Sequence, residues 1–196
     1  MLKIGITGGI GSGKTTICKV FETLGIPVFN ADTEAKLLMI NDPILIEGIK
    51  QTFGLKSYHE DGTLNNKHIA GIVFNQSAAL DKLNALVHPA VFNAFETWTK
   101  KIPASVPYVL KEAALLFESG SYRLCDKNIL VTAPMALKLA RVMERDKVSE
   151  AQVKARMDKQ FTDEQKSKFA DYFISNDEES SVLLQVLALH TAGWKD

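Results

Sequence analysis

The sequence has little of several features that define whole classes of protein. Its 196 residues include two cysteines and carry no net charge, with 23 acidic and 23 basic side chains. Neither cysteine has metal-ligand spacing, so we interpret Cys18 and Cys125 as reduced and structural. Balanced charge removes the broad attraction that a general nucleic-acid or anionic-membrane binder would show. No apolar run approaches the roughly 18 residues of a membrane span. We therefore expect a cytoplasmic protein that binds neither nucleic acid nor membrane.

What remains is the composition of an ordinary globular protein, with 46% hydrophobic and 23% charged residues. The length suits one well-cored α/β domain with insertions better than two independent domains.

Short apolar segments alternate with helical patterns along the chain. The strands we predict are 2–7, 26–29, 108–113, 128–132 and 172–175. Short buried strands separated by helices are typical of a parallel sheet, which binds ligands at the carboxyl ends of its strands. Gly8 and Asp32 both follow such ends.

Two helical segments interrupt this pattern. The first, 34–101, contains no parallel-type strand. The second, 136–168, carries nine basic and six acidic side chains and is locally basic in a neutral protein. We expect a core made of 1–33, 102–135 and 169–196, a helical binding domain at 34–101, a lid at 136–168, and a last helix over 178–190.

The chemistry is concentrated in the glycine-rich segment that follows the first strand. Gly8 to Thr15 satisfies G-x-x-x-x-G-K-[ST], between a predicted strand and a predicted helix. Without Cβ atoms such a loop can wrap a polyphosphate with its backbone N–H groups, aided by the helix N-terminus. A plain glycine turn with a surface lysine is the alternative, but spacing and context both favour nucleotide binding. The residues assigned to ATP here are Gly8, Gly9, Ile10, Gly11, Ser12, Gly13, Lys14, Thr15 and Thr16. Lys14 would reach the β- and γ-phosphates, and the Thr15 hydroxyl would ligate Mg²⁺.

Other nucleotide-dependent classes fit less well. A GTPase needs N-K-x-D, and Asn66-Lys67-His68-Ile69 lacks the final acid. An ATP-driven motor usually has a long apolar strand ending in Asp-Glu, which we do not find. A small-molecule kinase remains, with helical segments able to close over two substrates. A nucleotide-dependent switch without catalysis is the alternative from another class.

Further motifs narrow the class, because they occur in a fixed order from end to end. They are G-I-T-G-G-I-G-S-G-K-T-T from Gly5, N-A-D at 30–32, F-G at 53–54, D-G-x-L at 61–64, V-F at 73–74, L-N-A-L-V-H-P at 83–89, L-L-F-E at 115–118, R-V-M-E-R-D at 141–146 and A-R-M-x-x-Q at 155–160. In this combination the sequence resembles the dephospho-coenzyme A kinase family.

The resemblance implies transfer of the ATP γ-phosphoryl group to the ribose 3′-hydroxyl of dephospho-CoA, with Mg²⁺, as the last step of CoA synthesis. It also implies a three-layer α/β fold like that of nucleoside monophosphate kinases, with a five-stranded parallel sheet, a helical CoA-binding insertion and a helical lid. A kinase of a nucleoside monophosphate or another small alcohol is the alternative. For assembly we expect a monomer or a weak homo-oligomer.

Asp32 ends the strand expected beside the loop, and the resemblance makes it the acceptor of the hydroxyl proton. Its alternative role is to cap a helix beginning near Thr33. Arg141 and Arg145 share a helix face and would neutralise charge on the transferring phosphoryl group, unless they form only a solvated basic face.

Four further residues are assigned to the ligands. His88, before a proline, favours a rigid corner between helices with a structural or acceptor-binding role over proton transfer. The resemblance places Glu112 near the Mg²⁺ waters or the acceptor ribose, and Asn176 near the adenine. Lys67 stands close to where the family has an arginine, and Ala114 stands where it usually has a proline. Lys67 would meet an acceptor phosphate as a point charge and not as a planar fork.

Overall fold

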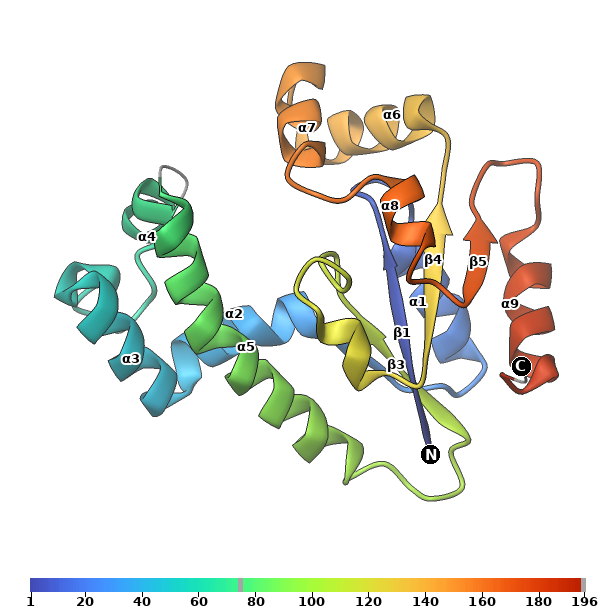
Figure 1. Ribbon diagram of the computed structural model, residues 1–196, viewed down its shortest axis with the longest axis horizontal. Coiled ribbons are helices and arrows are strands. Elements are labelled where there is room, and N and C mark those ends of the chain that lie inside the picture. Colours follow the sequence, from blue (N-terminus) through green and yellow to red (C-terminus); the bar gives the residue numbers. More distant parts are fainter. Residues whose placement is uncertain (74–75, 195–196) are drawn as a thin grey trace. The chain divides into compact units, whose positions relative to one another are not determined.

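The computed structural model describes residues 1–73 and 76–194, so Phe74 of the V-F motif and the end of the predicted core segment at 195–196 lie outside it. The chain divides into two compact units, residues 1–30 with 103–194 and residues 31–102. The first unit holds a five-stranded sheet in the order β2-β3-β1-β4-β5 (Figure 1). The strands are β1 (Leu2–Gly8), β2 (Val28–Asn30), β3 (Tyr108–Glu112), β4 (Lys127–Thr132) and β5 (Tyr172–Ser175).

All pairings in the sheet are parallel, as predicted, and their register aligns the carboxyl ends. Glu112 at the end of β3 is paired with Ile6 of β1 and with Asn30 of β2. On the other side of β1, Gly8 is paired with Val131. The last residues of three neighbouring strands therefore lie side by side at one edge of the sheet, where the glycine loop begins.

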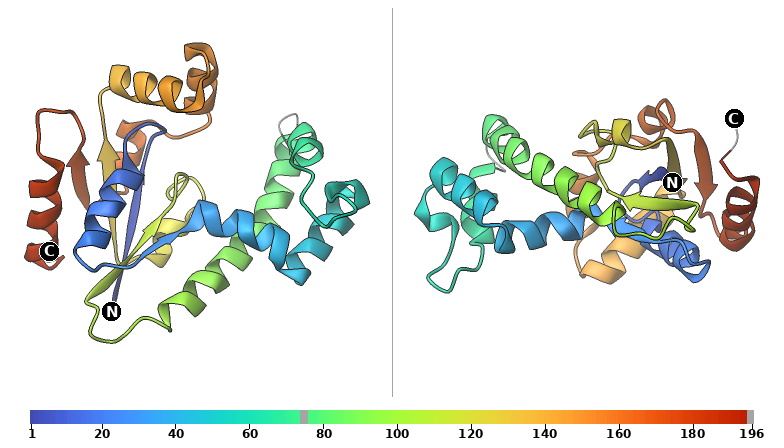
Figure 2. Two further views of the ribbon diagram at one scale, coloured as in Figure 1. Left: turned by 180° about the vertical axis from the view of Figure 1, so that it is seen from behind. Right: turned by 90° about the horizontal axis from the view of Figure 1, so that it is seen from below.

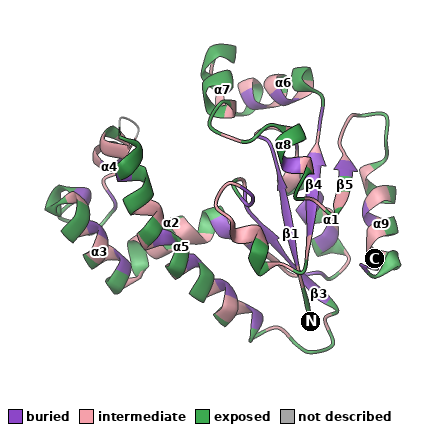
Figure 3. Ribbon diagram, in the orientation of Figure 1, coloured by how far each residue is buried: buried purple, intermediate pink, exposed green. Residues whose placement is uncertain are grey.

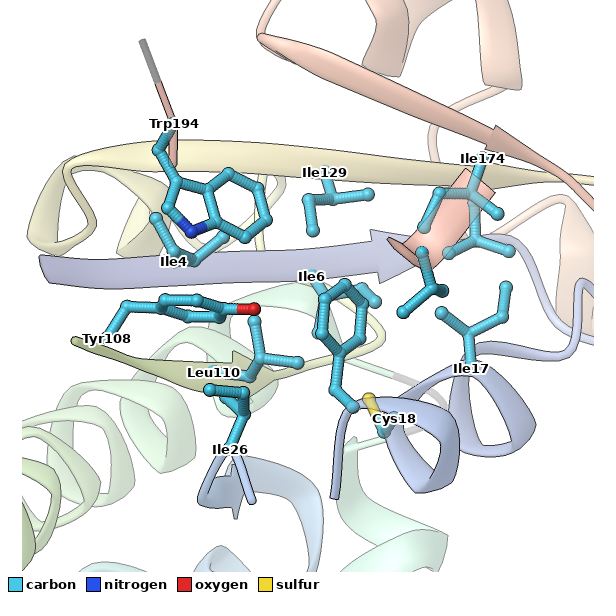
Figure 4. Packing of buried hydrophobic residues seen from close by; sticks show 13 residues of the cluster. Ile4, Ile6, Ile17, Cys18, Ile26, Tyr108, Leu110, Ile129, Ile174 and Trp194 are labelled. Carbon is cyan, nitrogen blue, oxygen red and sulfur yellow. The ribbon is translucent and has the colours of Figure 1, made fainter. Parts of the chain in front are cut away.

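One face of the sheet is buried under two helices, α1 (Lys14–Thr23) and α9 (Val182–Ala192). Figure 4 shows the side chains that meet there, including Ile4, Ile6 and Ile17, which have no exposed surface. Figure 3 shows the same concentration of buried residues along the strands. Burying each such side chain contributes roughly 1.5–3 kcal/mol, so this cluster fixes β1 and α1, which carry the loop between them.

The predicted helical segment 136–168 consists of three helices. They are α6 (Met135–Asp146), α7 (Glu150–Met157) and α8 (Asp163–Ser167), with the short helix η2 (Ser121–Leu124) earlier in the same unit. Lys147 has a φ of 54° and ends α6 in the left-handed conformation. Ser149 and Thr162 then begin the next two helices, each in a capping box with a glutamine three residues later.

The last helix is shorter than predicted. It begins at Val182, after the cap Ser181, and not at Glu178. Asp177 binds the backbone amides of Glu179 and Ser180, so these residues form a turn.

The described residues of the second unit form helices, joined by short loops, and one isolated bridge between Tyr58 and Leu64. Its elements are α2 (Ala31–Asn41), α3 (Pro43–Phe53), η1 (Leu55–Ser57), α4 (Asn66–Val73) and α5 (Ser77–Thr99) (Figure 2). Helix α5 packs against α2, α3 and α4, and the Tyr58 hydroxyl donates to the Met39 carbonyl at 2.7 Å. In the part of the chain that the structure describes, no helix has both the length and the apolar character to cross a bilayer.

The corner predicted at His88-Pro89 is wrong, because both residues lie inside α5. A proline there removes one hydrogen bond and crowds the preceding turn, at a cost of about 3 kcal/mol. Val87, Val91 and Phe95 are buried on the same helix, and their burial outweighs that cost. Tertiary packing therefore overrides the local preference against helix before a proline.

Candidate functional site

The glycine loop connects β1 to α1 and has a backbone that only glycine fits at two points. Gly11 and Gly13 have φ angles of 80° and 89°. A Cβ on Gly11 would lie 2.5 Å from the Lys138 carbonyl oxygen, and one on Gly13 would lie 2.1 Å from Asn176 Nδ2. The loop is therefore packed between α6 and the segment after β5, which hold its shape from outside.

Lys14, the first residue of α1, folds over this loop. Its ammonium group donates to the carbonyl oxygen of Gly8 at 2.8 Å and lies 3.4 Å from that of Gly9. The charge of Lys14 thus lies at the mouth of the loop, where a phosphate group would meet it.

Thr15, Glu112 and Asn30 form a hydrogen-bonded group beside the loop. The Thr15 hydroxyl donates to Glu112 Oε1 at 2.9 Å, and the Asn30 amide donates to Glu112 Oε2 at 2.8 Å. Glu112 is 6% exposed, so both of its oxygens are used inside the protein, while Thr15 is exposed. Because the Thr15 proton points to Glu112, the lone pairs of its oxygen are turned away from that carboxylate and are available to a cation.

The donor set at this point suits Mg²⁺. No group of three or more His, Cys, Asp or Glu able to hold a metal occurs among residues 1–73 and 76–194. Mg²⁺ bound with a nucleotide takes only one or two protein oxygens and fills its other positions with phosphate oxygens and water. Thr15 and Glu112 supply oxygens of this kind, so the residues fit the ion.

Cys18 lies one turn after Lys14 in α1, close to Glu112. Burial raises the pKa of its thiol, and the nearby carboxylate of Glu112 raises it further. Burial also raises the pKa of Cys125, to about 11. Both cysteines are free thiols. Their raised pKa values keep them protonated and unreactive at neutral pH, which agrees with a structural role.

Asn176 and Arg141 are brought to the loop from two distant segments. The Asn176 side chain donates to the Ser12 carbonyl at 2.9 Å. The Arg141 guanidinium lies 3.4 Å from the Asn176 carbonyl oxygen and 3.6 Å from Glu178. Arg141 therefore stands on the loop side of α6, as a residue that meets a nucleotide would.

Arg145, one turn further along α6, is held differently. It donates to both oxygens of Asp146, at 2.7 and 3.2 Å, and Arg156 binds the same carboxylate at 2.7 Å. The hydrogen bond from Arg145, then that from Arg156, lowers the pKa of Asp146 to about 2. Arg145 and Arg156 thus both bind the ionised carboxylate of Asp146, the last residue of α6. The Arg145 side chain remains 64% exposed.

The other predicted site residues belong to the helical unit and are all exposed. Asp32 is in the first turn of α2, which begins at Ala31, so the helix near Thr33 that Asp32 was expected to cap does not start there. Lys67 is the second residue of α4, and His88 lies near the middle of α5. The same unit has an open hollow of about 680 Å³, lined by Lys56, Tyr58, His59, Glu60, Asp61, Asn65 and His68.

Several residues against the loop were not identified from the sequence. The Gln160 side chain accepts a hydrogen bond from the Ile10 amide at 2.9 Å. Lys138, 5% exposed, forms an ion pair with Asp163. Lys166, with no exposed surface, forms one with Glu118 at 3.2 Å. Lys138, Gln160 and Asp163 line part of a cavity of about 500 Å³ beside Gly9 and Ile10.

Similarity to known proteins covers almost the whole chain. A family model for dephospho-CoA kinase matches residues 2–181. The dephospho-CoA kinase of Salinibacter ruber is 44% identical over 178 residues, which cover 90% of this chain and 89% of that protein. The dephospho-CoA kinase of Chlorobaculum tepidum is 40% identical over 181 residues, covering 90% and 86%.

Solved structures agree with this result. A crystal structure from Thermus thermophilus matches with a TM-score of 0.87 and 32% identity, covering 100% of this chain and 98% of that one. The dephospho-CoA kinase from Campylobacter jejuni matches with a TM-score of 0.67 and 29% identity, covering 97% and 98%. A shikimate kinase from Acinetobacter baumannii, at 18% identity and a TM-score of 0.52, shares the fold. The chain is therefore a member of the dephospho-CoA kinase family and a kinase that takes its phosphoryl group from ATP.

Proposed function

We propose that the chain transfers the γ-phosphoryl group of ATP to the ribose 3′-hydroxyl of dephospho-CoA, giving ADP and coenzyme A. The observation that carries this proposal is the glycine loop with Thr15 hydrogen-bonded to the buried Glu112 at the carboxyl edge of a parallel sheet, in a chain of this family. Such an edge is where open α/β sheets bind their ligands.

In the nucleotide half of this site, backbone amides of the glycine loop hold the phosphates and Lys14 adds a positive charge at the loop mouth. The Ile10 amide is the exception, because it donates to Gln160. We assign Asn176, whose side chain donates to the Ser12 carbonyl, to the adenine.

Thr15 would ligate Mg²⁺ directly, and Glu112 would orient Thr15 and bind water of the metal. When bound, the ion would neutralise charge on the β- and γ-phosphates. The carboxylate of Glu112 is already fixed by Asn30, so the threonine oxygen is presented in one orientation.

Asp32 is the proposed acceptor of the proton from the attacking hydroxyl. It lies two residues beyond Asn30 on the chain, and two extended residues span at most about 7 Å. Asp32 stands in the first turn of α2, which begins directly after Asn30. General-base assistance is worth roughly 10²- to 10⁴-fold in rate.

The remaining parts would bind the acceptor and close over it. We assign the helical segment 34–101, with His88 and Lys67, to dephospho-CoA. Segment 136–168 would act as the lid, with Arg141 and Arg145 facing the transferred group. A cytoplasmic location, and a monomer or weak homo-oligomer, stay predictions; the two free cysteines favour the location.

The test is ADP release with ATP and Mg²⁺ across a panel of acceptors. We expect selective stimulation by dephospho-CoA. Stimulation by AMP or by shikimate would instead indicate a kinase of a nucleoside monophosphate or of another small alcohol. Binding of ATP without turnover on any acceptor would indicate a switch protein.

Asp32→Asn tests the base. We expect this variant to bind ATP as the native chain does and to lose roughly 10²- to 10⁴-fold in kcat. An unchanged kcat would leave Asp32 with only its helix-terminal role.

A further inference from the structure

The glycine loop is bound from outside by the segment 158–168, which follows α7 and includes α8 and which we call the strap. The central contact is the hydrogen bond from the Ile10 amide to Gln160 Oε1, at 2.9 Å, between residues 150 positions apart. Within the loop, the Ser12 amide donates to the Gly9 carbonyl at 3.1 Å. The strap thus contacts the glycine loop at Ile10.

The strap is itself fixed at several points. Asp163 pairs with the buried Lys138 of α6, and both charged groups lie against Gly9. The buried Lys166 pairs with Glu118, which also accepts from the Phe161 amide at 2.8 Å. Buried charges that lose their partners are strongly destabilising, so these pairs hold the strap firmly. Gln160 is therefore presented to Ile10 by a rigid support.

Fixing this loop matters for ligand affinity. A glycine-rich segment loses more conformational entropy on ordering than any other, and that loss falls on ligand binding unless the free protein has already ordered it. Gln160 supplies a contact that orders the loop before the ligand arrives.

We propose that Gln160 is a positioning residue for nucleotide binding: through its side-chain carbonyl the strap holds the glycine loop in its phosphate-binding shape. This inference rests on the proposed role of the loop in binding ATP phosphates.

The strap offers a matched control in Gln165. Its side-chain carbonyl also accepts from a backbone amide, that of Thr162 at 2.8 Å, but this bond caps α8 and does not reach the loop. Gln160→Met and Gln165→Met therefore remove the same kind of hydrogen bond from the same segment with the same change of side chain.

The experiment measures ADP affinity by titration calorimetry on the full chain, together with hydrogen exchange of the peptide that contains Ile10. We expect Gln160→Met to weaken ADP binding about five- to tenfold and to accelerate exchange at Ile10. Gln165→Met is expected to change neither, although both variants lower Tm.

Equal effects of the two variants, no effect of Gln160→Met, or tighter ADP binding by it would overturn the proposal; the last would make Gln160 a latch that the nucleotide displaces. If Gln160→Met fails to fold, Gln160→Asn, whose amide is one methylene short of Ile10, takes its place with the same expectations. ADP affinity does not depend on which acceptor is phosphorylated. If Gln160→Met leaves ADP affinity unchanged while the native chain phosphorylates dephospho-CoA, only the role of Gln160 is rejected. If ADP affinity falls as expected but dephospho-CoA is not phosphorylated, only the proposed acceptor is rejected.

Discussion

Glu112→Gln is the substitution that most directly probes the link between the loop and the metal. Glu112 is 6% exposed and accepts two hydrogen bonds, from Thr15 at 2.9 Å and from Asn30 at 2.8 Å. The amide has nearly the same shape but no charge, and its NH₂ group can donate to the Thr15 oxygen. That donation would occupy a lone pair that the metal needs.

The magnitude follows from the two bonds. Hydrogen bonds to a charged group contribute roughly 1.5–3 kcal/mol and neutral ones roughly 0.5–1.5 kcal/mol. Each bond therefore weakens by about 1–1.5 kcal/mol. If the loss at Thr15 falls on metal binding, about 1.4 kcal/mol corresponds to a tenfold weaker affinity, within the range observed for residues that orient metal ligands.

The assay is ADP release as a function of Mg²⁺ concentration at saturating ATP and dephospho-CoA. We expect the midpoint of the Mg²⁺ dependence for Glu112→Gln to rise about tenfold. Asp171→Asn is the control, because it makes the same carboxylate-to-amide change at a residue that accepts a hydrogen bond from the Asn128 amide at 2.7 Å, at the amino end of β4 and away from Thr15. It is expected to lower Tm without moving the midpoint. The same midpoint in the native chain and in Glu112→Gln would refute the role given to Glu112.

Three further outcomes follow from the same structure. Arg145→Ala is expected to lower kcat far more than ATP affinity, measured by steady-state kinetics and nucleotide titration; the opposite pattern would make it only a binding residue. Gly13→Ala combines a φ of 89° with a Cβ placed 2.1 Å from Asn176, so we expect calorimetry to show no ATP binding at millimolar ligand, and near-native affinity would contradict the loop geometry. The pKa of Cys125 is about 11 and that of Cys18 is raised, so both thiols stay protonated up to pH 8. Iodoacetamide at pH 8 should then label neither in the native chain, as read by mass spectrometry, and both in urea; rapid native labelling would contradict their burial.

The parts of the fold that sequence predicts well are those set by local patterns. The strand from Leu2, the glycine loop and α1 follow one another within 23 residues, and each has its own signal: apolar β-prone residues, glycine spacing, then helical periodicity. The edge shared by Gly8, Asn30 and Glu112 follows from the parallel sheet itself.

Errors came where tertiary packing or capping decides the outcome. His88-Pro89 was expected at a corner, yet buried side chains of α5 keep it in the helix. The last helix was expected from Glu178, yet the turn that Asp177 forms and the cap Ser181 start it at Val182.

Gln160 belongs to a third group. It stands in the A-R-M-x-x-Q motif, but its partner Ile10 is 150 residues away, and no periodicity or spacing connects the two. Lys138 and Lys166 likewise look like part of a basic helix face, and only the structure shows that both are buried and paired. Contacts of this kind depend on the assembled fold.

The most direct measurement determines where the phosphate goes. The native chain is incubated with ATP, Mg²⁺ and dephospho-CoA, and the product is assigned by phosphorus NMR against authentic coenzyme A. We predict one new phosphomonoester, on the ribose 3′-oxygen, formed in equal amount with ADP. A phosphate at any other position, or ADP formed at the same rate without dephospho-CoA, would contradict the proposed reaction.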